Sequence, residues 1–344
     1  MSKRRKKSSI KPLVPFFVLG VALIAVLIAI FKYNDEDNGE NADESLTATV
    51  DDSNAVGSAS DVVLTLSGEE VYNVDFMQAN GVAMIEPSSY NSMADVIEDT
   101  MTEFGVDESQ ISLVFTNYQT GESYTVNENN FQTAASIIKL PLSVIYVDAI
   151  NEGAIDWDTE VPYTYADYEE GDGTITAAVA NGTGQAAYTI EDLIANALMY
   201  SDNTATNMLI RYYNELYGSG AYNTSIANSV DVPIDESFYS DNVASAELIS
   251  AYYDLLATDD TYQALVDYLL NTSPDRLFTT YVNSSLMANK YGSYGTALND
   301  GGIYYENDQA QYSLVVLTDG LSDGTSFLEN LNLRVNQYYR ANYL

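Results

Sequence analysis

The stretch FQTAASIIKLPLSVIYVDAIN, residues 131–151, predicts a buried helix around which the rest of the chain is organised. Its apolar side chains occur on nearly every face of a 3.6-residue helix, which is typical of a helix enclosed in a core. Two polar residues, Ser136 and Lys139, stand near its start. Because residues three apart share a helix face, this spacing places a hydroxyl beside an amine, a nucleophile beside a candidate base.

The same pair also fits a helix-capping serine followed by a solvated lysine. Short motifs recur by accident, and Ser8 and Lys11 have the same spacing within a basic tail. Pro141 adds a constraint, because a proline inside a helix removes a hydrogen bond, so this helix either begins later or kinks there. The pair therefore needs support from elsewhere in the chain.

The amino-acid composition limits which catalytic groups and metal sites the chain can have. The chain has 344 residues, with no cysteine and no histidine. The lack of cysteine excludes disulfides, thiolate metal sites and a cysteine nucleophile. The lack of histidine excludes Ser-His-Asp chemistry and most zinc sites. Acid–base chemistry falls to Lys, Asp, Glu, Tyr or water, and we expect neither a metal nor a cofactor.

Charge is divided sharply along the chain. All 50 acidic residues lie after Lys32, together with only 6 of the 13 basic residues. A surface this acidic repels phosphate backbones, so we expect no nucleic-acid partner. Only two of those six basic residues are lysines, Lys139 and Lys290, and neither lies in an acidic surface run. Their retention reflects either chance or function.

The N-terminal segments predict a membrane anchor. Residues 1–11 form a basic tail, and residues 12–31 follow without a charge, a length of 20 that crosses a bilayer as one helix. Basic residues before the helix place the N-terminus in the cytoplasm. We therefore expect a single-pass cell-membrane protein with an extracellular catalytic domain. The alternative is a cleaved signal peptide, although the apolar run is long and lacks a clear cleavage site.

The remainder divides into a linker and a folded domain. Residues 32–90 are rich in Asp, Glu, Asn, Ser and Gly and predict an acidic extracytoplasmic linker, and residues 91–344 predict the domain. Within the domain the patterns indicate helices at 92–104, 189–200, 205–213, 244–256, 261–270 and 326–339, and strands at 111–118, 123–126, 290–293, 296–305 and 312–318. This order predicts an α+β fold, an antiparallel sheet flanked by helices plus an all-helical portion.

Three short motifs occur in order, Ser136-Ile-Ile-Lys139, Ser201-Asp-Asn203 and Lys290-Tyr-Gly292. From about residue 92 onward the sequence resembles the class A β-lactamase and penicillin-binding-protein superfamily, whose marks are S-x-x-K, S-D-N and K-T-G. The contexts SDNTATNMLI and KYGSYGTALNDGGIYY extend the resemblance. A second Ser-Asp-Asn run at 240–242 directly precedes an apolar helix, so we interpret it as a helix cap.

The resemblance implies a catalytic role for three side chains. Ser136 would be the acylated nucleophile, Lys139 its base, and Ser201 the relay of a proton to the leaving nitrogen. Asn203 would hold Lys139 and the substrate amide. Lys290 would attract the substrate carboxylate and, together with desolvation, lower the pKa of Lys139.

The third motif would bind substrate along its strand, through Tyr291, Gly292 and Ser293. The backbone N–H groups of Ser136 and Ser293 would form an oxyanion hole. Tyr291 departs from the family pattern, because it replaces the threonine of K-T-G. The larger phenol is expected either to crowd the site or to turn away.

A second departure concerns release of the acyl group. Class A β-lactamases hydrolyse the acyl-enzyme with a Glu in an E-x-x-L-N loop between the second and third motifs. No such run is present, although Asp235 and Glu236 lie in the right interval. Without the loop Glu, the ester at Ser136 is expected to be long-lived.

Together these features predict an extracytoplasmic active-site serine hydrolase that forms an acyl-enzyme at Ser136 with β-lactams or related amides. Two alternatives stay open. One is a penicillin-binding-protein-like D-Ala peptidase or transpeptidase acting on peptidoglycan, and the other is a catalytically degenerate module that binds the cell wall. The expected partners are a β-lactam or small peptidoglycan-derived substrate, and the membrane through the N-terminal helix.

Overall fold

The computed structural model describes residues 71–344. The predicted basic tail (1–11), the predicted anchor (12–31) and most of the predicted linker lie outside the described residues. Within the part that is described, no helix combines the length and the apolar character needed to cross a membrane.

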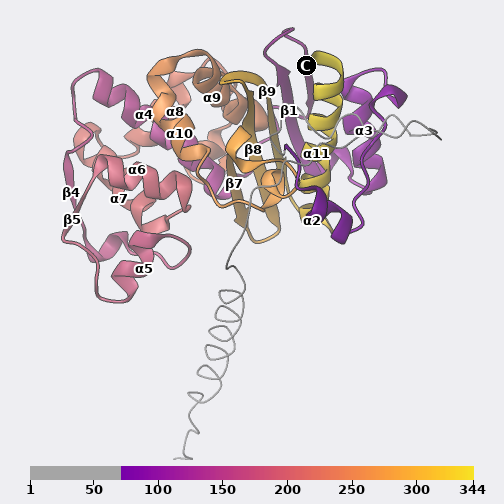
Figure 1. Cartoon of the computed structure of the whole chain (residues 1–344). Helices are drawn as coiled ribbons and strands as arrows, with labels where there is room; N and C mark the ends of the chain where they lie inside the picture. The colour runs from indigo at the N-terminus through magenta and orange to yellow at the C-terminus, as the bar shows by residue number, and fades with distance from the viewer. Residues whose placement is uncertain (1–70) are drawn as a thin grey trace, which may run out of the picture. The chain divides into compact units, whose positions relative to one another are not determined.

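A five-stranded antiparallel sheet runs through the domain between two groups of helices (Figure 1). Across the sheet the strands are β2 (Ser123–Val126), β1 (Ile111–Asn117), β9 (Gln309–Thr318), β8 (Ala297–Glu306) and β7 (Met287–Tyr294). β1 pairs with β9 along its whole length, so the first and last strands of the domain form one sheet. The predicted antiparallel α+β arrangement is confirmed.

Both faces of the sheet are buried, which explains the uninterrupted apolar runs of its central strands. Along β9, Leu314 and Val316 face one core cluster, whereas Val315 and Leu317 face the other. Successive side chains of a strand point to opposite faces. A strand covered on both sides therefore needs apolar residues at consecutive positions.

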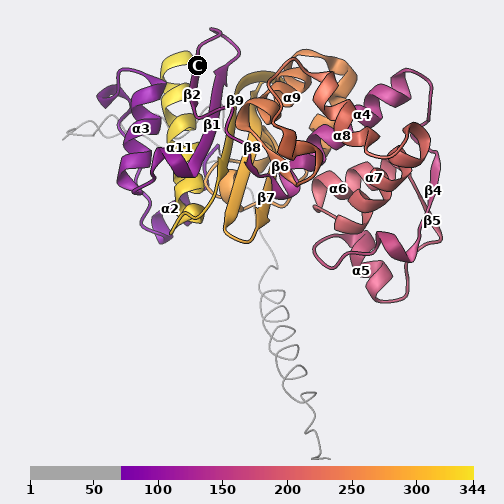
Figure 2. The same cartoon turned by 180° about the vertical axis from the view of Figure 1, so that it is seen from behind.

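Each face of the sheet has its own helices (Figures 1 and 2). α3 (Met93–Glu103) and α11 (Gly324–Tyr343) pack together on one face. α9 (Ala246–Thr258) packs on the other face, against β1, β8 and β9. This second face carries the helical portion of the domain.

α4 (Lys139–Asn151) runs through the middle of the helical portion, and its residues from Lys139 to Val147 are all buried. This burial agrees with its apolar character on all sides. The surrounding elements include α5 (Thr174–Ala180), α6 (Ile190–Met199), α7 (Asn203–Tyr217), α8 (Ala221–Ser229) and α10 (Gln263–Leu269). Two short ribbons join β3 (Gln132–Thr133) to β6 (Val243–Ala244) and β4 (Glu160–Pro162) to β5 (Ala187–Thr189).

The helix predicted for residues 131–151 begins later in the structure. α4 starts at Lys139, and Ser136 lies on the preceding 3₁₀ turn, η4 (Ala135–Ile138). Pro141 is the third residue of α4, where a backbone N–H has no partner within the helix, so the proline removes no hydrogen bond. Ser136 and Lys139 therefore span the join between η4 and α4.

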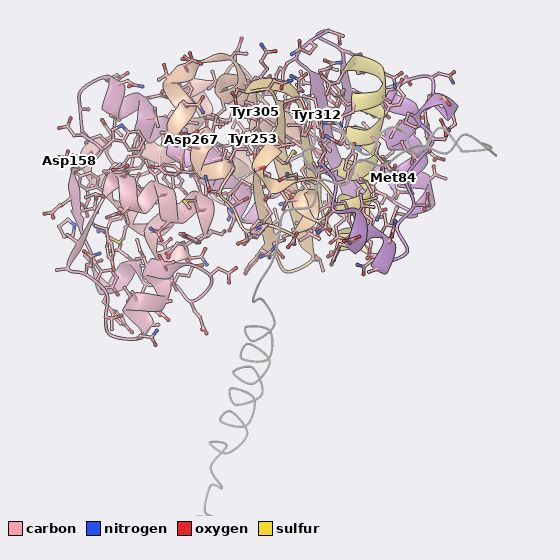
Figure 3. All side chains as sticks on the ribbon, in the orientation of Figure 1. Met84, Asp158, Tyr253, Asp267, Tyr305 and Tyr312 are labelled. Carbon is pink, nitrogen blue, oxygen red and sulfur yellow. The ribbon has the colours of Figure 1, made fainter. Side chains whose placement is uncertain are left out.

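The folded part of the chain begins before residue 91. Residues 71–90 belong to the predicted linker, yet Tyr72 is buried and forms a β-bridge with Val282. α2 (Val74–Ala79) follows. Met84 lies beside α11, where the Gln337 amide contacts its sulfur (Figure 3). Apolar side chains from this segment join the core next to α11.

Candidate active site

Ser136 lies at the wall of a cavity of about 350 Å³. The turn that carries it is held from two directions. The Ala134 amide donates to the Asn242 carbonyl at 3.0 Å, and Asn299 Nδ2 donates to the Ala134 carbonyl at 2.9 Å. Ala135 has a φ of +50°, a left-handed conformation that is strained for a residue with a side chain. A fixed backbone thus presents Ser136 to the cavity.

Lys139 is nearly enclosed, with 3% of its surface exposed. Its Nζ donates to the Ser201 carbonyl at 2.6 Å, to Asn203 Oδ1 at 2.8 Å and to Ser201 Oγ at 3.3 Å. The first and second motifs are therefore joined through one amine.

The second motif occupies the junction between α6 and α7. Asp202 is fully buried and caps α7, and its carboxylate accepts hydrogen bonds from the amides of Ile175, Thr176 and Ala205 at 2.7, 2.9 and 2.9 Å. These donors belong to α5 and α7. The carboxylate therefore ties both helices to the backbone of Ser201, which has a φ of +57°.

Lys290 brings the third motif to the same place. It is fully buried on β7, and its Nζ donates to Ser201 Oγ at 3.1 Å and to the Tyr291 carbonyl at 2.9 Å. Its amide donates to the hydroxyl of Tyr253 on α9 (labelled in Figure 3) at 3.1 Å, and Tyr253 donates in turn to the Gly301 carbonyl. Both lysines predicted as functional therefore meet at the Ser201 hydroxyl.

β7 passes directly against the backbone of η4. A Cβ added at Gly292 would lie 2.8 Å from both the Ala134 carbonyl oxygen and the Ser136 nitrogen. Only glycine permits this approach. Ser293 follows and lines the same cavity as Ser136. The two residues whose amides are predicted to form an oxyanion hole thus come from neighbouring segments.

Burial alters the protonation of both lysines. Desolvation lowers the pKa of Lys139 to about 8, although the charge of Asp202 acts in the opposite direction. Desolvation and then the charge of Lys139 lower the pKa of Lys290 well below its ordinary value. The resemblance implies that desolvation and Lys290 together lower the pKa of Lys139. In the structure desolvation lowers it, and the repulsion between the two lysines lowers the pKa of Lys290. Two ammonium groups at one hydroxyl are disfavoured, so the pair readily supplies a neutral amine.

Tyr291 turns away from the Ser136 cavity and lines a separate one of about 280 Å³. Arg276 Nη1 donates to its hydroxyl at 2.9 Å, and the guanidinium carbon lies 3.8 Å from the ring centroid. Lys290 Nζ lies 4.4 Å from the same centroid. The phenol therefore does not crowd Ser136, and its ring faces two cations, which an aromatic face attracts.

A loop at residues 164–173, absent from the predicted site, packs against the second motif. Asp167 is 2% exposed and forms a bidentate pair with Arg211 of α7, with N–O distances of 2.7 and 3.1 Å. Glu169 lines the Ser136 cavity, and its carboxylate accepts a hydrogen bond from Asn207 Nδ2 at 2.9 Å. In the sequence, the run YEEGDG (residues 168–173) is the only sign of this loop. Its composition equally fits an ordinary surface loop, so it does not indicate a site.

The second Ser-Asp-Asn run does not cap a helix, so that interpretation is wrong. Ser245 caps α9, and its Oγ accepts from the Leu248 amide at 3.1 Å. Residues 240–242 line the Ser136 cavity instead, and Asn242 Nδ2 donates to the Ala135 carbonyl at 3.3 Å. Pairing of β3 with β6 draws this run beside the serine, a contact that local sequence does not reveal.

We expect Gly173→Ala to destabilise the domain by about 2–4 kcal/mol. Gly173 has a φ of +116°, and an added Cβ would lie 2.2 Å from the buried Asp202 carboxylate. Relieving this clash requires a shift of the Asp202 carboxylate, which ties α5 to α7. Urea unfolding measures the loss.

Gly182→Ala is the matched control. Gly182 has a φ of +70°, but nothing lies within 4 Å of an added Cβ. It should cost only the left-handed strain, about 1–2 kcal/mol. Equal losses for the two variants would show that the contact with Asp202 is unimportant.

The groups that gather at this site are a serine hydroxyl, two buried amines and an intervening hydroxyl. A serine beside a partly neutral amine can attack a carbonyl carbon with the amine as base. In the described residues 71–344, no group of three or more acidic side chains is placed to hold a metal ion.

Residues 92–339 match the model of the Beta-lactamase enzyme family. No curated protein matches the sequence. Similar solved structures include a PBP-A variant in an acyl-enzyme complex with penicillin G, with 18% identity and a TM-score of 0.61 over 73% of this chain and 97% of that one. A β-lactamase from Burkholderia vietnamiensis has 16% identity and a TM-score of 0.60 over 74% and 98%. Another β-lactamase, from Sphaerobacter thermophilus, has 20% identity and a TM-score of 0.57 over 72% of this chain and 95% of that one.

At these identities the likeness to solved structures establishes the fold. The family model spans most of the chain and all three motifs. This protein therefore belongs to the β-lactamase enzyme family.

Proposed function

We propose that this protein is an extracytoplasmic active-site serine hydrolase that forms an acyl-enzyme at Ser136 with a β-lactam or related amide. The meeting of Lys139 Nζ and Lys290 Nζ at Ser201 Oγ, at 3.3 and 3.1 Å, carries the proposal. Neutral Lys139 accepts the Ser136 proton as the oxygen attacks the carbonyl. Ser201, held by Lys290, passes its proton to the leaving nitrogen and takes the proton that Lys139 received from Ser136, across the 3.3 Å contact between Lys139 Nζ and Ser201 Oγ.

The neighbouring groups support binding of the acyl intermediate. The amides of Ser136 and Ser293 are proposed to stabilise the oxyanion, a contribution of about 2.7–4 kcal/mol per donor in a comparable hydrolase. Asn203 would contact the substrate amide, and the charge shared by Lys139 and Lys290 would attract its carboxylate. The extracellular location rests on the charge pattern of residues 1–32.

A peptidoglycan-directed peptidase or transpeptidase is the second candidate. The chain has no E-x-x-L-N run, and neither Asp235 nor Glu236 lines the Ser136 cavity. An enzyme of this kind would hold its acyl group long enough to pass it to an amine.

Intact-mass measurement with benzylpenicillin tests the proposal. We expect the wild type to gain the mass of one whole penicillin, located on the Ser136 peptide and absent from Ser136→Ala. A persistent adduct supports the peptidoglycan-directed enzyme, and rapid release of ring-opened product supports the β-lactamase. If no acylating probe labels Ser136 at any pH, the domain is a binding module and the proposal is wrong.

A further inference from the structure

Two carboxylates share the cavity with Ser136, namely Glu169 and Asp241. Neither is one of the two carboxylates, Asp235 and Glu236, that the sequence indicates for deacylation. Asp235, from the predicted interval, is committed to capping η6 (Glu236–Tyr239), where its carboxylate accepts from the Ser237 amide at 2.9 Å.

Of the two cavity carboxylates, Glu169 belongs to the loop that contacts the reacting groups, because Asn203, which accepts from Lys139 Nζ at 2.8 Å, donates to the carbonyl of the adjacent Glu170 at 3.4 Å. The negative charge of Glu169 raises the pKa of Lys139, three residues from Ser136, whereas Asp241 is not among the groups that act on Lys139 or Lys290. Asp241 instead accepts a hydrogen bond from its neighbour Ser240 at 3.1 Å. Glu169 is therefore the better placed of the two to reach an acyl group on Ser136.

Glu169 is also held in position. Asn207 Nδ2 donates to its Oε2 at 2.9 Å, and the Glu169 amide donates to Thr204 Oγ1 at 3.4 Å. Both partners lie on α7, the helix that begins with Asn203. The Asp167–Arg211 pair fixes the loop two residues earlier. The residue is exposed, so water reaches the carboxylate from the cavity.

We propose that Glu169 is the general base that activates water to hydrolyse an acyl-enzyme at Ser136. Water attacks the ester carbonyl carbon, and Glu169 accepts a proton from the water as the new C–O bond forms. The bond from carbon to Ser136 Oγ then breaks, the proton passes to Oγ, and a free acid leaves. This inference rests on the proposed acylation of Ser136. It assigns deacylation to a loop that precedes the second motif, whereas the E-x-x-L-N loop follows it.

The test follows each half-reaction with benzylpenicillin by intact mass. We expect E169Q to acylate no more slowly than wild type, because loss of the Glu169 charge favours neutral Lys139. It should lose the acyl group about 10²-fold or more slowly, the typical contribution of a general base. E169D should recover part of that rate, because it keeps the carboxylate. Hydroxylamine should release the acyl group from E169Q, since it attacks without a base. Melting temperatures report whether each variant is folded.

Two controls separate Glu169 from other carboxylates. Asp241→Asn changes the other cavity carboxylate, and Glu160→Gln changes an exposed one on β4 that does not line the cavity. E160Q should deacylate at the wild-type rate. Equal adduct lifetimes in E169Q and wild type, with or without slowed deacylation in D241N, would overturn the role of Glu169 and leave acylation at Ser136 intact. A wild type that neither carries the adduct nor releases ring-opened penicillin would overturn both proposals.

Discussion

Replacement of Lys139 by methionine is expected to slow acylation of Ser136 by about 10²–10⁴-fold, the range for loss of a general base. Methionine keeps the length of the side chain but cannot accept a proton. Desolvation lowers the pKa of Lys139 to about 8. Wild-type acylation should therefore accelerate as the pH rises through about 8, and K139M should lose this dependence. Stopped-flow or quenched intact-mass measurement over this range tests both points.

The same substitution has a stability signature. In the folded protein the Lys139 pKa is about 8, below the ordinary value of 10.5, so the unfolded chain binds more protons between these values. The free energy of unfolding therefore decreases by roughly 3 kcal/mol as the pH falls from about 10.5 to 8, and it increases again as the pH rises. K139M lacks this penalty. The melting temperature of the wild type relative to K139M should thus increase from pH 8 to pH 10, and a constant difference would contradict the lowered pKa.

The sequence is informative where chemistry demands a residue type at a fixed spacing. The S-x-x-K, S-D-N and K-x-G runs are separated along the chain, yet Lys139 and Lys290 meet at Ser201 as their retention suggests. A buried lysine costs free energy, so a domain that otherwise lacks lysine is expected to keep one in its core only for a compensating role. The antiparallel sheet is equally predictable, because alternation and turn residues mark its strands.

Contacts between segments distant in sequence are what local patterns do not reveal. Glu169 lines the cavity because Asn207 and Arg211 of α7 hold its loop, and nothing in the local sequence pairs either residue with that loop. Asn242 reaches Ala135 through the two-residue ribbon of β3 and β6, which is too short to predict from alternation. Contacts between segments that are distant in the sequence, which form only in the folded chain, complete the site.

The four arginines that follow residue 32 also have defined contacts in the structure. The side chains of Arg211, Arg334 and Arg340 form ion pairs with Asp167, Glu103 and Glu306. Arg276 packs over Tyr291. In a domain with a large excess of acid, each arginine thus has defined side-chain partners. Arg211 matters most for the site, because it pins the loop that carries Glu169 to α7.

Gly292→Ala is expected to slow acylation by about 10²–10³-fold, the effect of losing one oxyanion donor. An added Cβ would lie 2.8 Å from the Ser136 nitrogen and 2.9 Å from the Ile137 nitrogen. These are backbone atoms, which cannot rotate away, so β7 and η4 must separate. That separation moves the amide of Ser293 relative to that of Ser136. We also expect a loss of about 1–3 kcal/mol in unfolding free energy from overpacking.

Gly324→Ala separates the effect of the close backbone contact at Gly292 from the effect of adding a methyl group at a buried glycine. Gly324 at the start of α11 is buried like Gly292, but an added Cβ would meet only the side chains of Leu298 at 3.4 Å and Leu321 at 3.5 Å, which are ordinary contacts. It should acylate normally. Normal acylation by G292A, despite lower stability, would show that the spacing of β7 and η4 does not matter to the reaction. Impaired acylation in G292A alone would instead tie the close approach of these backbones to stabilisation of the oxyanion, because no functional side chain is changed.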